Sequence, residues 1–311
     1  MTLSLICPSD RNTLSETASG LFCPMCGRQY PLKGGVVCTL DRPDDFYEGT
    51  YENQVRFLPR SERLWHAWPL WLINSGYVWA VRRFVHSGAT VVELGCAGGV
   101  RYFGRRYRMV GCDLSLSALK KLEFYERRVQ ADAAVCIPLP DGSADAVVCS
   151  YFWEHISPEV KPDILRECQR VLRPGGKLVF LYDVETDNPL IRRCKENNGA
   201  LYQKLFVEGD GHLGYQRPSE NLGAFEEAGF RVIEHHGMEK TWMQSPSTYF
   251  KLAQFRTVGG RLLAWASKLG QQPIFYPYVA LVRLVDTLIC PWLPMNWARI
   301  DLVVCVTESS K

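Results

Sequence analysis

The stretch Val91-Val-Glu-Leu-Gly-Cys-Ala-Gly-Gly99, followed by Val110-Gly-Cys-Asp113, decides the fold class of this chain. In the first stretch an apolar, β-branched run ends in an acidic residue and a glycine-rich turn. The second apolar run ends in Asp113, 20 residues after Glu93. This pattern is typical of a nucleotide-binding crevice, in which acidic residues and a turn almost free of side chains lie at the carboxyl ends of neighbouring parallel strands. Glycine permits the backbone dihedrals of such a turn and lets the backbone approach the ligand.

The turn Gly95-Cys-Ala-Gly-Gly99 lacks the glycine spacing of the dinucleotide-binding fingerprint. The segments that follow it specify the fold more closely, because their apolar patterns alternate between strands and a helix. In chain order they are Gln130–Ala133 as the end of a third strand, Leu139–Ser150 as a turn and fourth strand, Ile164–Lys177 as an amphipathic helix closed by Pro-Gly-Gly, and Leu178–Tyr182 as a fifth strand.

Residues 90–182 resemble the class I methyltransferases that use S-adenosylmethionine, in both motif content and motif order. The resemblance implies an α/β fold with a Rossmann-like, seven-stranded sheet and helices on both faces. It also implies that Glu93 and the turn hold the methionine part, Asp113 the ribose, and Asp132 with the Ala133 backbone the adenine. Ser150 and Tyr151 would flank the methionine and the sulfonium. The implied cofactor-binding set is Glu93, Gly95, Cys96, Ala97, Gly98, Gly99, Asp113, Leu114, Asp132, Ala133, Ser150 and Tyr151.

One position departs from the family pattern. The family turn usually has a glycine where this chain has Ala97. Alanine is the mildest replacement, so the departure bears on affinity for the cofactor and leaves the family assignment in place.

Composition and charge narrow the function classes. The chain has 311 residues, of which 47% are hydrophobic and 22% charged, as expected for a globular protein with one large domain and appendages. A formal net charge of +3 is too small to argue for a nucleic-acid partner. The first residues lack a basic start followed by an apolar core, and cysteines such as Cys112 and Cys149 lie in apolar runs. We therefore expect a cytoplasmic protein with reduced thiols.

Two short knuckles near the N-terminus, Cys7-Pro-Ser-Asp10 and Cys23-Pro-Met-Cys26, indicate a structural zinc site. Each has two residues between its end positions, a spacing that brings four donors to a tetrahedral zinc ion. The second knuckle resembles the zinc-ribbon module found at the front of some methyltransferases. Asp10 stands where a second cysteine is expected, so Cys38 is an alternative fourth ligand. A relic of the ribbon that binds no metal is the other interpretation.

The chain divides into three parts. Residues 1–40 are the zinc-ribbon-like module, 41–86 a polar linker with an aromatic helical cover, and 87–311 the methyltransferase domain. In the second part Trp65, Trp68 and Trp71 lie at helical spacing. This stripe either packs on the sheet or covers the acceptor side of the crevice.

The second half of the chain predicts a sixth strand that ends at Val232 and a seventh over Arg299–Val306, paired antiparallel in the resembled fold. Between them lies an apolar, aromatic insertion at about 238–298, which distinguishes this chain from the plain fold. Arg283, Asp286 and several prolines argue against a membrane-spanning helix there. The insertion is either a helical lid or dimer contact, or an amphipathic helix in peripheral contact with a membrane, which would suit a lipid-linked acceptor.

Two histidines are candidate catalytic residues. Methyl transfer is an in-line displacement, so positioning supplies most of the catalysis, and a base is needed only for a hydroxyl or a protonated amine. His155, just beyond the fourth strand, can take the acceptor proton near neutral pH. His212, on a glycine-rich loop, is the second candidate. A structural role in capping or packing is the alternative for both.

The predicted function is a methyltransferase that acts on a small molecule, a sugar or a lipid-linked glycan intermediate. The apolar insertion and the aromatic cover favour a closed pocket over an open basic groove. Methylation of a ribosomal-RNA base is a second hypothesis, based on the zinc ribbon, although the chain has no prominent basic and aromatic strip. A scaffold that keeps the fold without catalysis is a third. It has no need of the three acids Glu93, Asp113 and Asp132 at strand ends.

Overall fold

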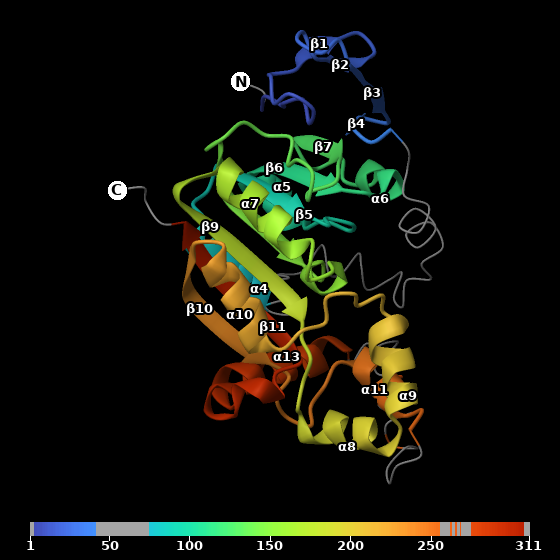
Figure 1. Ribbon diagram of the computed structural model, residues 1–311. Coiled ribbons are helices and arrows are strands. Elements are labelled where there is room, and N and C mark those ends of the chain that lie inside the picture. Colours follow the sequence, from blue (N-terminus) through green and yellow to red (C-terminus); the bar gives the residue numbers. More distant parts are fainter. Residues whose placement is uncertain are drawn as a thin grey trace.

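A single mixed sheet forms the centre of the protein (Figure 1). The computed structural model describes residues 3–41, 75–255 and 275–307, together with the single positions 262, 265 and 268. Within these residues eleven strands pair in the order β1-β2-β3-β4-β7-β6-β5-β8-β9-β11-β10. The strands are β1 (Ser15–Thr17), β2 (Gly20–Phe22), β3 (Gln29–Lys33), β4 (Val36–Cys38), β5 (Thr90–Leu94), β6 (Arg108–Asp113), β7 (Arg127–Gln130), β8 (Ala144–Ser150), β9 (Leu172–Asp183), β10 (Phe230–Met238) and β11 (Ile300–Thr307).

The middle of the sheet is parallel, in the order β7-β6-β5-β8-β9. Val92 of β5 pairs with Val110 of β6 on one side and with Val147 of β8 on the other. Every residue of β5 is buried, as expected for a parallel strand whose sheet is covered on both faces. β11 lies between β9 and β10 and is antiparallel to both. The predicted antiparallel pairing of the last two strands is therefore confirmed, but β10 continues past the predicted end at Val232 to Met238, through a register shift between Val232 and Glu234.

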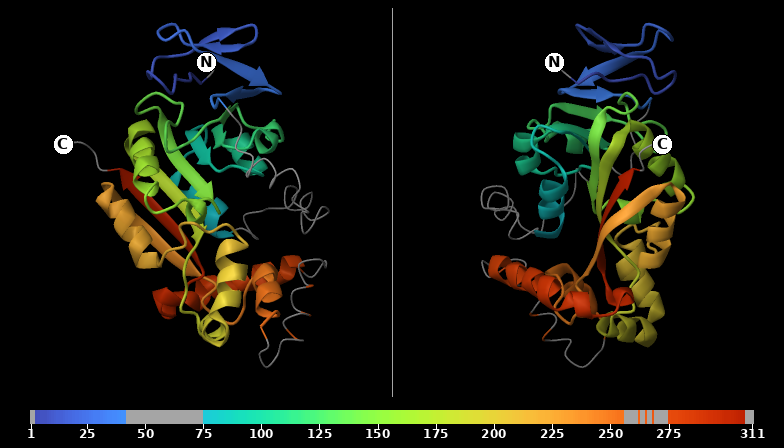
Figure 2. Two further views of the ribbon diagram at one scale, coloured as in Figure 1. Left: turned by 45° about the vertical axis from the view of Figure 1, so that its right-hand side comes forward. Right: turned by 90° about the vertical axis from the view of Figure 1, so that its left-hand side faces the viewer.

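Helices cover both faces of the sheet (Figure 2), as the sequence predicts. On one face α7 (Lys161–Val171) and α10 (Pro218–Glu227) contribute Ile164 and Phe225 to a core that contains Val92 and Leu94. On the other face α4 (Ser75–Phe84), α5 (Arg101–Arg106) and α6 (Leu116–Lys120) pack over Val91. The alternating apolar runs of the sequence thus produce a three-layer α/β/α architecture.

Helix α7 ends at Val171, before the predicted end at Lys177. Leu172 already pairs with Ala144 of β8, so the Pro-Gly-Gly segment belongs to β9. Proline has no backbone N–H to donate within a helix, and Gly175 adopts a φ of +76°. The segment that the sequence pattern assigns to the end of a helix is therefore the start of a strand.

The N-terminal module is continuous with the main sheet. β1, β2, β3 and β4 form an antiparallel meander. β4 then runs parallel to β7, with Val37 opposite Val129. The predicted module of residues 1–40 is therefore attached to the sheet edge beyond β7, at the opposite end of the strand order from β10 (Figure 1).

A further layer of helices lies beyond the lower end of β9 in Figure 1. It combines α8 (Pro189–Asn197), α9 (Gly199–Tyr202) and the π-helix η2 (Gln203–Glu208) with α11 (Pro246–Leu252) and α13 (Phe275–Leu288) of the predicted insertion. An apolar cluster joins them, with Tyr202 and Phe206 packed against Tyr249 and Leu252. In the described part of the chain, none of the helices has the length and apolar character that crossing a membrane requires.

Most of the predicted linker and aromatic cover lies outside the described residues, including Trp65, Trp68 and Trp71. The described end of that segment is α4, which packs on the sheet. Its Tyr77 is fully buried, whereas Trp79 is exposed.

Candidate active site

A pocket lies at the carboxyl ends of β5, β6 and β7 and beneath the segment that follows β8. The pocket is partly open to solvent. This is the edge of a parallel sheet where ligands bind in α/β folds. The lining residues are Gly95, Cys112, Asp113, Leu114, Ala131, Asp132, Ala133, Tyr151, Phe152, His155, Ile156, Val160 and Ile164.

The turn after β5 requires glycine at its first position. Gly95 has a φ of +57°, and a Cβ atom there would lie 2.3 Å from Cδ2 of Phe152. Gly99 has a φ of +55°, and a Cβ atom there would lie 2.7 Å from a side-chain carbon of Leu122. Both positions therefore exclude other residues by dihedral angle and by space. Gly98 differs, because a Cβ atom there would meet nothing within 4 Å.

The two acids at the ends of β6 and β7 are oriented by backbone N–H groups. Asp113 accepts from Ser115 N at 2.9 Å through one carboxylate oxygen and from Ala97 N at 3.0 Å through the other. The second contact ties the end of β6 to the glycine-rich turn. Asp132 accepts from Ala134 N at 2.9 Å. An ionised carboxylate accepts about four hydrogen bonds, so both acids can also accept from ligand hydroxyl or amino groups.

Tyr151 follows β8 in a conformation that is rare for a residue with a side chain. Its φ is +54°, its side chain lines the pocket and 43% of its surface is exposed. The Tyr151 N–H donates to Leu181 O at 2.8 Å, which holds the backbone in place. Such strained residues gather at functional sites. Ser150 is the last residue of β8, is half-buried and is not among the residues that line the pocket.

Glu93 is buried, and two tyrosine hydroxyls donate to its carboxylate. Its carboxylate accepts from the Tyr77 hydroxyl at 3.0 Å and from the Tyr125 hydroxyl. Burial raises the pKa of Glu93 to about 7, although both hydroxyls act in the opposite direction. Tyr125 in turn accepts from Val100 N at 2.9 Å. Glu93 thus supports the turn through Tyr125, and its predicted contact with the cofactor stays a prediction.

His155 and His212 lie side by side. Their ring centroids are 5.3 Å apart. His155, in the short 3-10 helix η1 (Trp153–His155), lines the pocket, and its Nδ1 lies 3.0 Å from Gly211 O. His212 is buried behind it and stacks on Tyr215. Burial lowers the pKa of His212. The structure brings the two predicted catalytic histidines together, although they are 57 positions apart in the chain.

Two charged residues next to these histidines were not singled out in the sequence. Glu154 is 1% exposed, and burial raises its pKa well above the usual range. Lys161 is buried and its Nζ donates to Gly214 O at 2.9 Å, to Gln216 Oε1 at 2.6 Å and to Asn221 Oδ1 at 2.9 Å. These bonds fix the loop that carries His212. The only sequence signal for Glu154 was its position beside His155.

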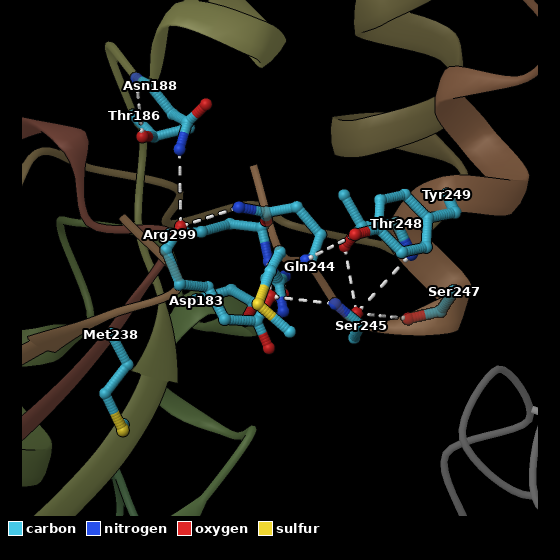
Figure 3. A network of polar contacts seen from close by, with 12 residues as sticks. Asp183, Thr186, Asn188, Met238, Gln244, Ser245, Ser247, Thr248, Tyr249 and Arg299 are labelled. Carbon is cyan, nitrogen blue, oxygen red and sulfur yellow. Dashed lines mark hydrogen bonds and ion pairs between the residues drawn. The ribbon is translucent and has the colours of Figure 1, made fainter. Parts of the chain in front are cut away.

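A buried ionic network joins the helical layer to the sheet (Figure 3). Arg299 donates to Glu239 Oε2 at 2.7 Å and to Asp183 Oδ2 at 3.0 Å. These partners are separated from it by 60 and 116 residues, so no local spacing could predict them. The Asn188 side chain donates to the carbonyl oxygens of Glu239, Lys240 and Thr241. Together these contacts anchor the start of the insertion to the end of β9.

The N-terminal module brings Cys7, Asp10, Cys23 and Cys26 together, with one ligand atom of each within 4.8 Å of the others. The Sγ atoms of Cys7 and Cys26 are 3.6 Å apart, and Cys23 Sγ lies 3.1 Å from Asp10 Oδ2. Cys38, the alternative fourth ligand, lies in β4, where its thiol donates to Val36 O at 3.7 Å. The arrangement therefore favours Asp10 as the fourth donor.

Comparisons with known proteins agree with this geometry. Residues 92–180 match a family described as "Methyltransferase domain". The chain is 29% identical over 164 residues to a tRNA N(3)-methylcytidine methyltransferase of Drosophila melanogaster, covering 46% of this chain and 49% of that one. It is 28% identical over 170 residues to a ubiquinone biosynthesis O-methyltransferase of Xanthomonas axonopodis pv. citri, covering 50% and 68%.

A solved structure shares the fold. The complex between the Haloferax volcanii Trm112 methyltransferase activator and a methyltransferase contains a chain that matches with a TM-score of 0.51 and 16% identity, covering 86% of this chain and 99% of that one. At this identity the likeness supports the fold alone. The chain spans about half of the Drosophila relative and 62% of a ubiquinone/menaquinone biosynthesis C-methyltransferase of Syntrophotalea carbinolica.

Proposed function

We propose that this chain, which contains a class I S-adenosylmethionine-dependent methyltransferase domain, transfers a methyl group from S-adenosylmethionine to a small-molecule acceptor. One observation carries the proposal. A single pocket contains the glycine turn, the two acids at the ends of adjacent strands and an imidazole, in Gly95, Asp113, Asp132 and His155. A scaffold protein would gain nothing from this combination.

The residues present fit the cofactor. Gly95 lines the pocket and carries no side chain, so the ligand can approach the backbone there. Asp113 suits the ribose hydroxyls and Asp132 the adenine, since carboxylates form strong charge-assisted hydrogen bonds. The aromatic rings of Tyr151 and Phe152 line the same pocket and favour a sulfonium charge by about 0.5–2 kcal/mol. When bound, the cofactor supplies a methyl group that is activated by the positive sulfur.

His155 is our candidate for the residue that receives the acceptor proton. The tautomer with hydrogen on Nδ1 donates to Gly211 O, so Nε2 carries the lone pair. A neutral imidazole with an available nitrogen can act as a general base near neutral pH. His212 stacks on Tyr215, with the His155 ring tilted against it, and acts as a positioning residue in this proposal.

The helical layer favours a small acceptor. It is held by an apolar cluster and by the buried Arg299 network, and it follows directly from the end of β9. A nucleic-acid partner would require a strong basic surface, whereas the net charge is only +3. A sugar or a lipid-linked glycan intermediate fits within this acceptor class.

The outer face of α13 favours a lipid-linked acceptor. Its buried side carries the Arg283–Asp286 ion pair, whereas Leu281, Leu284 and Leu288 are exposed. Trp292 in the following turn η4 (Cys290–Trp292) is 87% exposed. A helix with its apolar side outward is suited to the surface of a bilayer. Sedimentation with phosphatidylcholine vesicles tests this contact: the chain should pellet with them and Leu288→Glu should not, while equal recovery of both in the supernatant contradicts it.

RNA methylation is the second candidate, because one relative is named as a tRNA methyltransferase. Filter binding with transfer and ribosomal RNA over a range of salt concentrations distinguishes the candidates. RNA affinity that falls steeply with added salt would support the RNA function. Absence of binding at low salt would remove it.

The four N-terminal donors are proposed to hold a structural zinc ion. Three thiols and a carboxylate match the donors of tetrahedral zinc sites. The Tyr30 hydroxyl lies 3.0 Å from Cys7 Sγ, at hydrogen-bond distance, and helps to orient this thiol. Metal analysis of the purified chain should find zinc, and Cys26→Ser should contain one zinc ion fewer per chain. Equal zinc content in both proteins contradicts this site.

The methyltransferase activity is tested with cell extracts as the source of acceptors. Extracts incubated with the chain and S-adenosylmethionine should contain a small-molecule product heavier by one methylene group, detected by mass spectrometry. The product should be absent with Gly95→Ala. Methylation that appears only in the RNA fraction would overturn the small-molecule assignment.

A further inference from the structure

Glu154, His155 and His212 form a second cluster of potential metal ligands, far in sequence from the N-terminal cysteines. One ligand atom of each lies within 4.8 Å of the others. Glu154 and His155 come from η1, directly after β8, and His212 comes from the loop that follows η2. The cluster adjoins the pocket, because His155 lines it.

One ring nitrogen of His155 has an oxygen partner at hydrogen-bond distance, since Nδ1 lies 3.0 Å from Gly211 O. Histidines that bind metals show this arrangement, because an oxygen partner on one nitrogen fixes the ring and keeps the lone pair on the other. His212 Nε2 lies 3.9 Å from Asp210 Oδ2, which is beyond hydrogen-bond distance. The remaining nitrogens are His155 Nε2 and His212 Nδ1.

Two potential ligand atoms of the cluster are buried without a hydrogen-bond partner. Within the described chain, neither Glu154 Oε2 nor His212 Nδ1 has a hydrogen-bond partner. The residues are 1% and 7% exposed. Buried polar atoms in native proteins almost always have partners, and an orphaned one calls for an explanation such as a missing ion. A cation would satisfy both atoms at once.

Lys161 does not neutralise Glu154 by a direct ion pair. An ammonium group has three donors, and those of Lys161 are used by Gly214 O, Gln216 Oε1 and Asn221 Oδ1. Gly214 N also donates to Glu154 O at 2.9 Å, and a Cβ atom at Gly214 would lie 1.8 Å from Ile156 O. The loop that carries His212 is therefore fixed against η1, as a preorganised site requires.

We propose that Glu154, His155 and His212 bind one divalent transition-metal ion at the acceptor side of the pocket. Two imidazoles and one carboxylate are the donor set that Mn²⁺, Fe²⁺, Co²⁺ and Zn²⁺ accept, with open positions for a ligand. This inference rests on the proposed methyltransferase function and specifies its acceptor as one with an oxygen atom that can coordinate a cation.

The general-base role proposed for His155 applies to the metal-free chain. With an ion bound, His155 Nε2 would be a ligand, and the ion would take over removal of the acceptor proton, because one lone pair cannot serve both. Coordination lowers the pKa of a bound hydroxyl, and its proton leaves to water. The resulting oxyanion forms the new carbon–oxygen bond to the methyl group. The carbon–sulfur bond breaks, and its electron pair returns to sulfur as a neutral thioether.

The test is a titration of the full chain, stripped with a chelator, with Co²⁺ alone. Wild type should bind two ions. One should show thiolate-to-cobalt charge-transfer absorption and be lost in Cys26→Ser, which marks the N-terminal site. The second should show only the weaker d–d absorption and should persist in Cys26→Ser.

In the Cys26→Ser background, His212→Ala and Glu154→Gln should each lower the affinity for the second ion by at least about tenfold. Glu154→Gln preserves the shape of the side chain, so its metal-free thermal unfolding serves as the control for folding. No second ion in Cys26→Ser, or the same affinity after His212→Ala, overturns the proposal. Calorimetry with S-adenosylmethionine separates failure of the metal site from failure of the proposed function. If wild type binds the cofactor but no second ion, only the metal site is rejected. If wild type binds neither, the proposed function is rejected as well.

Discussion

Residues 90–182 hold the proposed cofactor site and are called the cofactor half here, and the described residues of 183–307, proposed to hold the acceptor, are called the acceptor half. The two are built in different ways. In the first, the functional residues follow directly from strand ends, as Gly95 follows β5 and Asp113 ends β6. In the second, Arg299 bridges Asp183 and Glu239 across 116 and 60 residues. The difference teaches that the proposed cofactor site is specified largely by strand ends, whereas the proposed acceptor half is held to the sheet by long-range polar contacts.

The largest effect is expected where the acceptor half is tied to the sheet. Arg299→Met leaves the Asp183 and Glu239 carboxylates buried without their shared cation, and loss of one partner of a buried pair costs about 3–5 kcal/mol. Denaturant unfolding measures the change. Arg166→Met is the control, since Arg166 is 71% exposed and its ion pair with Asp163 contributes about 0–1 kcal/mol. Equal losses in both variants would remove the special role of the network.

The next-largest effect is expected from a substitution in the glycine-rich turn of the cofactor half. Gly95→Ala places a methyl group against Phe152 at a positive φ, and we expect a loss of stability of about 2–4 kcal/mol and loss of cofactor binding. Gly142→Ala is the matched control, because Gly142 has a φ of +58° and open space around it. The control isolates the cost of the dihedral angle. If both variants unfold at the same temperature, close packing at Gly95 is unimportant.

A smaller effect is expected on binding without a change in fold. Asp113→Ala removes the carboxylate proposed for the ribose and should weaken S-adenosylmethionine binding by about 1.5–3 kcal/mol. Calorimetry measures the affinity, and circular dichroism checks the fold. Asp163→Ala, on the surface of α7, should bind as wild type does. Unchanged affinity in Asp113→Ala would count against the ribose role.

The smallest effect concerns Glu93 and pH. Its pKa is raised from 4.5 to about 7 in the folded protein, so the folded state holds the proton more tightly than the unfolded state. The stabilising contribution is therefore complete below about pH 4.5 and is lost as the pH rises through about 7. Glu93→Gln should lack this dependence, so its free energy of unfolding relative to that of wild type should rise as the pH rises from about 4.5 to about 7. A difference in unfolding free energy between wild type and Glu93→Gln that is the same at every pH would contradict the raised pKa of Glu93.

Sequence patterns predicted the strands of the cofactor half well, and the reason is local. The alternation of apolar runs and turns gave the order of β5 to β9, and the turn chemistry placed Gly95 and Asp113 at the pocket. The end of α7 was predicted too late, because Leu172 pairs with β8 and begins β9. The close approach of His155 and His212 depends on the loop that Lys161 fixes. Neither the Arg299 network nor the orphaned Glu154 oxygen leaves a periodic signal in the chain.

The central claim is tested most directly by a crystal structure of the chain soaked with S-adenosylmethionine. The account predicts density for the ligand over the turn from Gly95 to Gly99, with its ribose hydroxyls within hydrogen-bond distance of Asp113. Ligand density elsewhere, or a pocket that stays closed to the ligand at saturating concentration, would contradict it.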